Sequence, residues 1–261
     1  MTDPFVPRAG AVLSADIAVP EHARVVEFYT AVLRTGTRPL WGDDLMNDLG
    51  MPIIGIGERV EAYAELPLQW MPHIQVEDVG ASVEEATRRG GRALMHAKDD
   101  QGGSQWAVLS DPDGAAFGLI PVSPPPPEPA EADAATRAKA GRIAWLDLTV
   151  HDADAARDFY AAVIGWTPDP ASMKDDAGAY SDYCMLAGGQ AVAGVCHARG
   201  PNLGLPPVWM LYVPVGDLNA SIAAIEPSGG SVLEVMRGKG DAPTGVILRD
   251  PIGAHMALVA G

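Results

Sequence analysis

The chain contains the stretch Asp111-Pro112-Asp113-Gly114-Ala115-Ala116-Phe117-Gly118-Leu119 and, near its end, the matching stretch Asp250-Pro251-Ile252-Gly253-Ala254-His255-Met256-Ala257-Leu258. In each copy Asp-Pro starts a tight turn, because proline fixes φ, and glycine supplies the permissive backbone that such a turn needs. An apolar run follows and predicts a strand. A turn and strand that occur twice indicate an internal repeat.

Other motifs repeat in the same order. The segment Glu27-Phe28-Tyr29-Thr30-Ala31-Val32 matches Asp158-Phe159-Tyr160-Ala161-Ala162-Val163, and Asp78 matches Asp217. Between the halves, residues 122–140 contain four consecutive prolines and an Ala/Glu/Asp-rich run, which is typical of a semi-rigid spacer. The sequence therefore predicts a first domain at residues 1–121, a Pro/Ala-rich linker at 122–140 and a second domain at 141–261. The extra residues of the second half are expected between Tyr160 and Asp217.

Composition narrows the class of protein. The 261 residues are 48% hydrophobic and 20% charged, and no apolar run is long enough to span a membrane. The formal net charge of −16 argues against nucleic acid or an anionic membrane as partner. The N-terminus lacks the pattern of a secretory signal, and two cysteines do not make a disulfide framework, so a cytoplasmic protein is expected.

Each half divides again into two similar units. Residues 142–150 predict a strand, and 152–164 predict a helix that Gly165 ends. Strands at 183–186 and 191–196 flank a turn at Gly188-Gly189; a strand at 208–213 and a helix at 217–226 begin the next unit. In the first half a helix is predicted at 83–89. Four units of strand, helix and two or three strands predict an α+β fold.

Two such units together would enclose one concave space, here called a cup. Pairing within each half would place His73 beside Asp16, whereas pairing across the linker would place it beside Asp147. The sequence leaves both arrangements open. Phe28-Tyr29 and Phe159-Tyr160 are expected to pack their helices onto the sheets.

A strand, a helix ending in Phe-Tyr and an Asp-Pro-x-Gly-Ala strand resemble the vicinal oxygen chelate superfamily, which includes glyoxalase I, bleomycin-resistance proteins and extradiol dioxygenases. The second half is similar to the tandem glyoxalase-like proteins of actinobacteria through Trp145-Leu146-Asp147-Leu148, Asp158-Phe159-Tyr160, Gly165-Trp166, Val192-Ala193-Gly194 and Trp209-Met210-Leu211-Tyr212. The resemblance covers nearly the whole chain outside the linker. It implies four βαβββ units that form two half-barrel domains in tandem, and it leaves the activity open because this fold carries many functions.

The resemblance also implies where a divalent metal would bind. Enzymes of the superfamily use His, Gln or Glu on the first strand of each paired unit and Glu on a late strand. The corresponding positions here are Ser14, Trp145, Met71, Met210, Gly118 and Ala257. A hard divalent ion needs converging imidazoles and carboxylates, so we expect no metal and no other cofactor. A one-residue slip in strand register would still allow a metal to be bound by His73, Asp147 or His255.

Strand alternation predicts which side chains share each cup. The first cup is expected to hold Ser14, Asp16, Met71 and His73, with Phe117 near its rim, and the second to hold Trp145, Asp147, Met210, Tyr212 and His255. An apolar cavity with a few polar groups is typical of a small-molecule site. The predicted binding residues are Asp16, Met71, Trp145, Met210 and Tyr212, and the candidate catalytic residues are Asp147, His255 and His73.

Three classes of function fit these cups. The first is a metal-independent protein of the bleomycin-resistance type that binds a hydrophobic or aromatic natural product or antibiotic. The alternative is a metal-free lyase, isomerase or cyclase of secondary metabolism that uses Asp and His as general acid and base. The third is an interaction or regulatory protein with vestigial cups. Because an inward carboxylate is costly unless paired, a structural role is the alternative for Asp147. A monomer or a homodimer is expected.

Overall fold

The computed structural model describes residues 8–33, 40–41, 44–46, 52–123 and 143–261. Residues 124–140 of the predicted linker therefore lie outside the described residues. The first half contains β1 (Val12–Val19), α1 (His22–Leu33), β2 (Leu40–Trp41), β3 (Asp44–Met46), β4 (Pro52–Glu58), the 3-10 turn η1 (Glu61–Tyr63), β5 (Met71–Val76), α2 (Val79–Arg88), β6 (Arg92–Lys98), β7 (Ser104–Ser110) and β8 (Ala116–Pro121).

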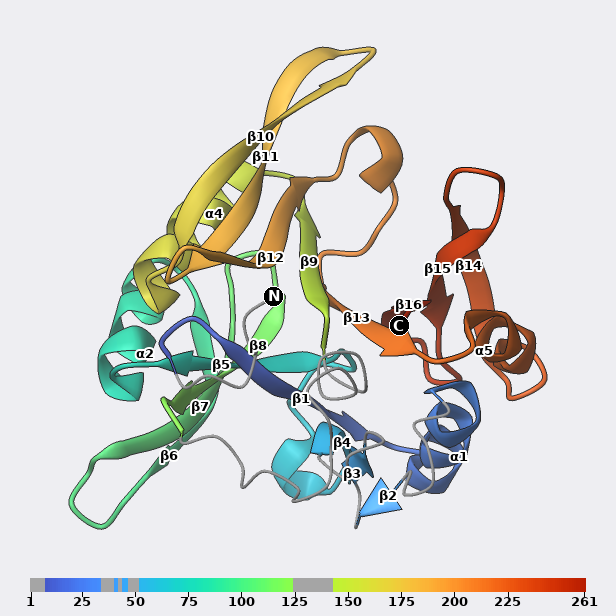
Figure 1. The fold of residues 1–261 in the computed structure, drawn as a ribbon. Helices are drawn as coiled ribbons and strands as arrows, with labels where there is room; N and C mark the ends of the chain where they lie inside the picture. The colour runs from blue at the N-terminus through green and yellow to red at the C-terminus, as the bar shows by residue number, and fades with distance from the viewer. Residues whose placement is uncertain (1–7, 34–39, 42–43, 47–51, 124–142) are drawn as a thin grey trace, which may run out of the picture.

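The second half repeats this order. It contains β9 (Trp145–Val150), α4 (Ala153–Ile164), β10 (Thr167–Asp175), β11 (Gly178–Ala187), β12 (Gln190–His197), the 3-10 turn η2 (Gly200–Asn202), β13 (Trp209–Val215), α5 (Leu218–Ile225), β14 (Ser231–Arg237), β15 (Pro243–Arg249) and β16 (His255–Ala260). Each of the four units is a strand, a helix and three strands. The predicted α+β fold of four βαβββ units is confirmed (Figure 1).

Each half forms its own sheet of eight strands. The strand orders are β2-β3-β4-β1-β5-β8-β7-β6 and β10-β11-β12-β9-β13-β16-β15-β14. At the middle of each sheet the first strands of two units pair antiparallel, β1 with β5 and β9 with β13. The units therefore pair within each half, and none of the described strands of one sheet pairs with a strand of the other.

Local capping explains where the helices begin and end. The carboxylates of Asp78, Asp152 and Asp217 each accept a hydrogen bond of 3.0 Å from the backbone N–H three residues later. Gly165 ends α4 in the left-handed conformation, at φ 86°. Because Asp78 is a cap, α2 starts at Val79, earlier than the predicted residue 83.

One hairpin of the second half is longer than its counterpart in the described part of the first half. Strands β10 and β11 have 9 and 10 residues, whereas β2 and β3 have 2 and 3. This hairpin projects from the body of the protein (Figure 1). β10 does not follow from the local pattern, because Pro168 and Pro170 are unfavourable inside a strand. Both are tolerated because β10 is the edge strand of its sheet.

The helices of the two halves pack in pairs, α1 with α5 and α2 with α4 (Figure 1). The buried Tyr29 hydroxyl on α1 donates to Asp250 Oδ2 at 3.0 Å and accepts from Trp70 Nε1 at 3.1 Å. The second half makes the equivalent contact with the first, because the Tyr160 hydroxyl on α4 donates to Asp111 Oδ2 at 2.9 Å. The Phe-Tyr motifs are buried in the core, and each Tyr hydroxyl also bonds to the Asp-Pro turn of the opposite half.

Phe117 also belongs to this junction, so its predicted place at the rim of the first cup is wrong. Its ring is fully buried and makes edge contacts with Phe159 and Tyr160, with centroids 6.1 and 5.3 Å apart. Alternation along β8 explains the error, because Gly118 faces the cup and its neighbour Phe117 must face the other side.

Candidate ligand-binding site

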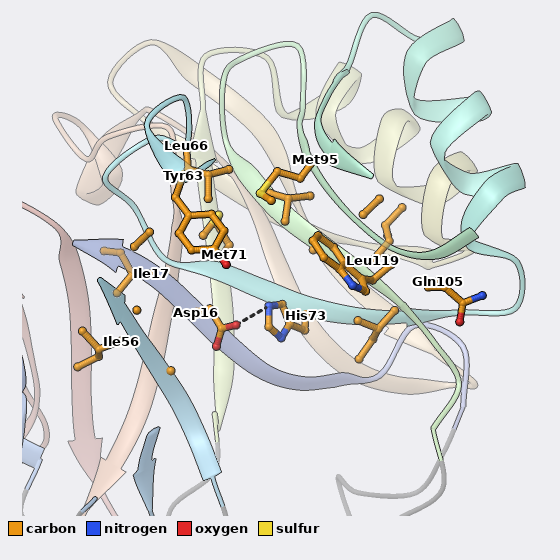
Figure 2. Close-up of a pocket in the computed structure, with 18 of the residues that line it drawn as sticks. Asp16, Ile17, Ile56, Tyr63, Leu66, Met71, His73, Met95, Gln105 and Leu119 are labelled. Atoms are coloured by element: carbon orange, nitrogen blue, oxygen red, sulfur yellow. Dashed lines mark ion pairs between the residues drawn. The ribbon is translucent and has the colours of Figure 1, made fainter. Parts of the chain in front are cut away.

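A cavity of about 550 Å³ lies on the cup face of the first sheet. Strands β1, β4, β5, β6, β7 and β8 form its walls, and the segment that contains η1 contributes Tyr63 and Leu66. Figure 2 shows Asp16 and His73 side by side on the wall, with Tyr63, Leu66 and Met71 gathered next to them. The volume falls within the range of sites for drug-sized molecules.

Two polar side chains of this wall, Asp16 and His73, form a connected group with Ser14. Ser14 Oγ is 3.0 Å from His73 Nδ1. On the other side of the ring, His73 Nε2 is 3.4 Å from Asp16 Oδ2, the pair that Figure 2 marks with a dashed line. The neutral imidazole that carries its proton on Nε2 satisfies both contacts, because it accepts at Nδ1 and donates toward the carboxylate. The structure thus brings Ser14, Asp16 and His73 together, as pairing within each half predicts.

The rest of the lining is mainly apolar. Met71 is buried beside Leu66 and Val108, whereas Tyr63 and Trp106 keep 36% and 40% of their surface exposed. Gln105 and Ser123 add neutral polar groups. Among the described residues that line the cavity, Asp16 is the only carboxylate, and none is Lys or Arg.

The second cup brings Trp145, Asp147, Met210 and Tyr212 onto one face. Asp147 lies opposite Met210 in the strand register, and Tyr212 lies opposite Trp145. Trp145 Nε1 donates to Asp147 Oδ1 at 2.7 Å, and the Tyr212 hydroxyl also bonds to this carboxylate. Burial raises the pKa of Asp147, against the lowering effect of these two donors. The carboxylate is thus paired within the protein.

His255 is half-buried on β16, opposite Arg249 of β15. Burial lowers its pKa, and the positive charge of Arg249 acts in the same direction. Within the described residues, no hydrogen bond or ion pair joins His255 to Asp147. The predicted catalytic residues are therefore spread over both cups, His73 in the first and Asp147 and His255 in the second.

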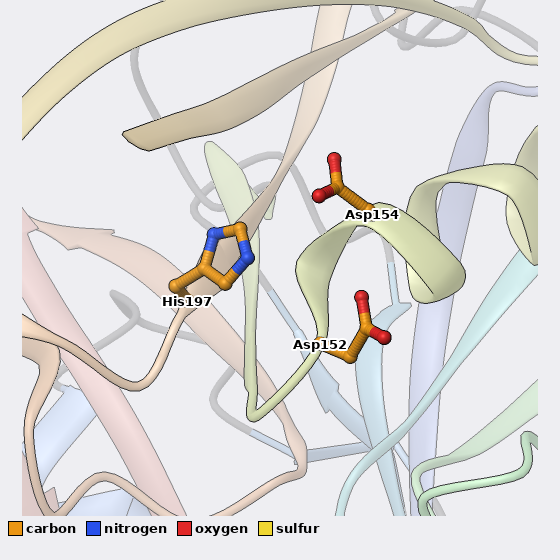
Figure 3. Close-up of side chains that lie close together, drawn as sticks. All are labelled: Asp152, Asp154 and His197. Carbon is orange, nitrogen blue, oxygen red and sulfur yellow. The ribbon is translucent and has the colours of Figure 1, made fainter. Parts of the chain in front are cut away.

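The side chains at the six expected metal-ligand positions do not suit a hard divalent ion. Ser14 contacts His73, and the Trp145 N–H donates a hydrogen bond to Asp147. Met71 and Met210 pack in apolar clusters, and Gly118 and Ala257 have no side-chain atom that could bind a metal. Elsewhere in the described residues, Asp152, Asp154 and His197 place three ligand-type atoms within 4.8 Å of one another (Figure 3). These groups already have partners, since Asp152 caps α4, Asp154 binds Arg157 and His197 contacts Asp182.

The sequence analysis missed several residues of the cavity: Tyr63, Leu66, Met95, Gln105 and Trp106. Tyr63 and Leu66 come from an irregular segment that has no strand alternation to interpret. Trp106 offered a usable signal, because a large aromatic residue in a strand with polar neighbours is a candidate for the exposed face.

The chain is similar in sequence to several known proteins. It is 29% identical to "Putative glyoxylase CFP32" of Mycobacterium tuberculosis, over 97% of this chain and 95% of that protein. It is 28% identical to the anthracycline biosynthesis protein DnrV of Streptomyces peucetius, over 74% of this chain and 66% of that protein.

Solved structures share the fold at much lower identity. The 2,2',3-trihydroxybiphenyl 1,2-dioxygenase of Sphingomonas wittichii matches at a TM-score of 0.58 and 18% identity, over 98% of this chain and 91% of that one. The homoprotocatechuate 2,3-dioxygenase of Arthrobacter globiformis matches at a TM-score of 0.62 and 14% identity, over 98% of this chain and 80% of that one. The family model described as "Glyoxalase-like domain" matches residues 13–120 and 144–259. The chain therefore belongs to the glyoxalase-like domain family and carries two copies of that domain in tandem.

Proposed function

We propose that this protein binds a hydrophobic or aromatic small molecule in the cavity of the first half, without a bound metal. The cavity carries the proposal, because it combines about 550 Å³ of space with apolar and aromatic walls and a few convergent polar groups. The similarity to an anthracycline biosynthesis protein supports a ligand from secondary metabolism. No helix among the described residues is long and apolar enough to cross a membrane.

The contrast between the cups supports the first as the binding site. Asp147 in the second cup is held by Trp145 and Tyr212, whereas its positional equivalent Asp16 keeps about half of its side-chain surface exposed. A paired, buried carboxylate stabilises its strands, and an exposed one remains available to a ligand.

Tryptophan fluorescence tests the proposal with a panel of polycyclic aromatic compounds that includes anthraquinones. Trp106 lines the cavity, so we expect a bound compound to change the emission and the change to be strongly reduced in Trp106→Phe. Trp145→Phe, which removes a tryptophan from the second cup, is the matched control and should retain the response. Loss of the response in Trp145→Phe alone would place the ligand in the second cup, and no response to any compound would refute binding.

Metal content is tested separately. Protein purified without chelators is expected to carry no stoichiometric Zn, Fe, Mn or Ni, because the expected ligand positions lack hard donors. One equivalent of metal that is lost on His73→Gln would contradict the metal-independent proposal.

The enzyme alternative is a metal-free lyase, isomerase or cyclase. The observation in its favour is that His73 and Asp16 are in contact on the cavity wall, since an imidazole held by a carboxylate can exchange a proton with a bound ligand. Turnover that disappears in His73→Gln while binding persists would establish it. Equal activity of wild type and variant would exclude His73 from catalysis.

A further inference from the structure

We propose that the ligand of this cavity is an organic cation, an apolar or aromatic body that carries an ammonium group bound at Asp16. This inference rests on the proposed function and names the chemical class of its ligand. It follows from the distribution of charge and aromatic surface around the cavity.

The described part of the cavity wall has one permanent charge, and it is negative. Among the described lining residues, Asp16 is the only carboxylate and no Lys or Arg is present to neutralise it. Its side chain is 52% exposed, and within the described residues its one ion-pair partner is His73, at 3.4 Å. A carboxylate can accept about four hydrogen bonds, so this contact leaves most of its acceptor capacity free.

The neighbours of Asp16 do not supply the missing donors. In the strand register Asp16 lies between Gly55 of β4 and Met71 of β5, and neither side chain can donate a hydrogen bond. The equivalent carboxylate of the second cup, Asp147, has both a tryptophan N–H and a tyrosine hydroxyl. Among the described residues, Ser14 and His73 stand where the second cup has Trp145 and Tyr212, and of these two only His73 contacts the carboxylate of Asp16, at 3.4 Å.

The apolar part of the wall also suits a cation. Tyr63 and Trp106 present partly exposed rings to the cavity, and an ammonium group is attracted to the face of such rings. Met71 and Met95 add polarisable sulfur that adapts to a bulky apolar body. A carboxylate or phosphate ligand would meet Asp16 without any compensating cationic side chain.

The net charge of the whole protein also favours a cationic ligand. A net charge of −16 raises the local concentration of cations and slows the approach of anions. Long-range attraction and the local carboxylate therefore favour the same class of ligand.

Two probes of the same shape isolate the charge: naphthalen-2-ylmethylammonium, whose N–H groups can donate to Asp16, and its neutral carbon analogue, 2-ethylnaphthalene. We expect the cation to bind on the order of five- to ten-fold more tightly than the neutral probe, as measured by tryptophan fluorescence titration. In Asp16→Asn this preference should disappear while the affinity for the neutral probe stays within two-fold. Asp16→Glu keeps the charge and should retain a preference for the cation.

Glu84→Gln is the matched control, because it removes one charge from the exposed face of α2 and should leave the preference unchanged. Equal affinity for the two probes would overturn this inference and leave the proposed function standing. A preference for the cation that survives in Asp16→Asn would also overturn it. Binding of neither probe would refute the proposed function and this inference together.

Discussion

Single glycines on the strands determine which polar side chains can occupy the cups. A Cβ at Gly118 would lie 2.6 Å from Cδ2 of His73, and a Cβ at Gly194 would collide with the carboxylate of Asp147. Each glycine therefore provides the space for one polar group. Gly118 is also a position where the superfamily would carry a metal ligand, so the residue that lacks a donor makes room for an imidazole.

Gly118→Ala tests this relation. The added methyl group should displace the His73 ring and disrupt its contacts with Ser14 and Asp16, at a cost of about 1 kcal/mol in the free energy of unfolding. The imidazole resonances of His73 should shift, and affinity for a cavity ligand should fall about three-fold or more. Ala257→Gly, at the equivalent position of the second half, is the control. It should leave the His73 resonances and the affinity for a cavity ligand unchanged. Unchanged His73 resonances in Gly118→Ala would contradict the proposed contact.

Asp111 gives stability a defined pH dependence. Its burial raises the pKa of the carboxyl to about 6, against the hydrogen bonds from Ala115, Tyr160 and Asp113 that lower it. In the unfolded chain the pKa is about 3.9, so the folded state binds more protons between these values. This contribution to the free energy of unfolding is fully present below about pH 4 and is lost as the pH rises through about 6, by at most about 3 kcal/mol.

Urea denaturation between pH 4 and pH 7 measures this contribution as the difference between wild type and Asp111→Asn. The free energy of unfolding of wild type, relative to that of Asp111→Asn, should fall as the pH rises from 4 to 7, because asparagine does not titrate. A difference that is constant with pH would show that Asp111 has an ordinary pKa.

At the scale of elements, helices α1 and α4 connect the halves through their tyrosines. Each hydroxyl donates to the aspartate of the opposite turn and accepts from a tryptophan N–H of its own half. Gly230 permits this approach on one side, since a Cβ there would lie 2.5 Å from Cε2 of Phe28. The helix and turn motifs of the repeat thus form two equivalent contacts.

Tyr160→Phe should lower the free energy of unfolding by about 2–3 kcal/mol, because it leaves a buried carboxylate and the N–H of Trp209 without this partner. Tyr29→Phe should act similarly. Tyr180→Phe is the control, since the buried hydroxyl of Tyr180 has no hydrogen-bond partner among the residues that the structure describes, and it should cost little. Equal losses in all three variants, measured by denaturant unfolding, would show that the contacts between the halves contribute nothing specific.

At the scale of the whole molecule, pairing of units within each half separates the two cups. His73 contacts Asp16 in the first sheet, and Asp147 belongs to the second sheet. His73→Gln and Asp147→Asn should therefore be additive in the free energy of unfolding to within about 0.5 kcal/mol.

The combination His73→Gln with Asp16→Asn provides the comparison. These residues are in contact, so their effects should deviate from additivity by about 0.5 kcal/mol or more. A coupling between His73 and Asp147 larger than that between His73 and Asp16 would be inconsistent with the cups described above.

The sequence by itself determined the repeat, the plan of a strand, a helix and two or three further strands in each unit, and the lack of hard donors at the expected metal positions. These features depend on local patterns: turn chemistry, helical spacing and strand alternation. Alternation also placed Asp16, Met71 and His73 on one face correctly, whereas Phe117 was assigned to the wrong side.

Only the tertiary structure decided the pairing of the units, the contacts of Tyr29 with Asp250 and Tyr160 with Asp111, and the cavity residues Tyr63 and Trp106. These features depend on contacts between segments far apart in the chain, which local periodicity does not encode. The Asp-Pro-x-Gly-Ala turn shows both levels: its fold follows from its own residues, whereas its role in joining the halves depends on a tyrosine 49 residues away in one copy and 221 in the other.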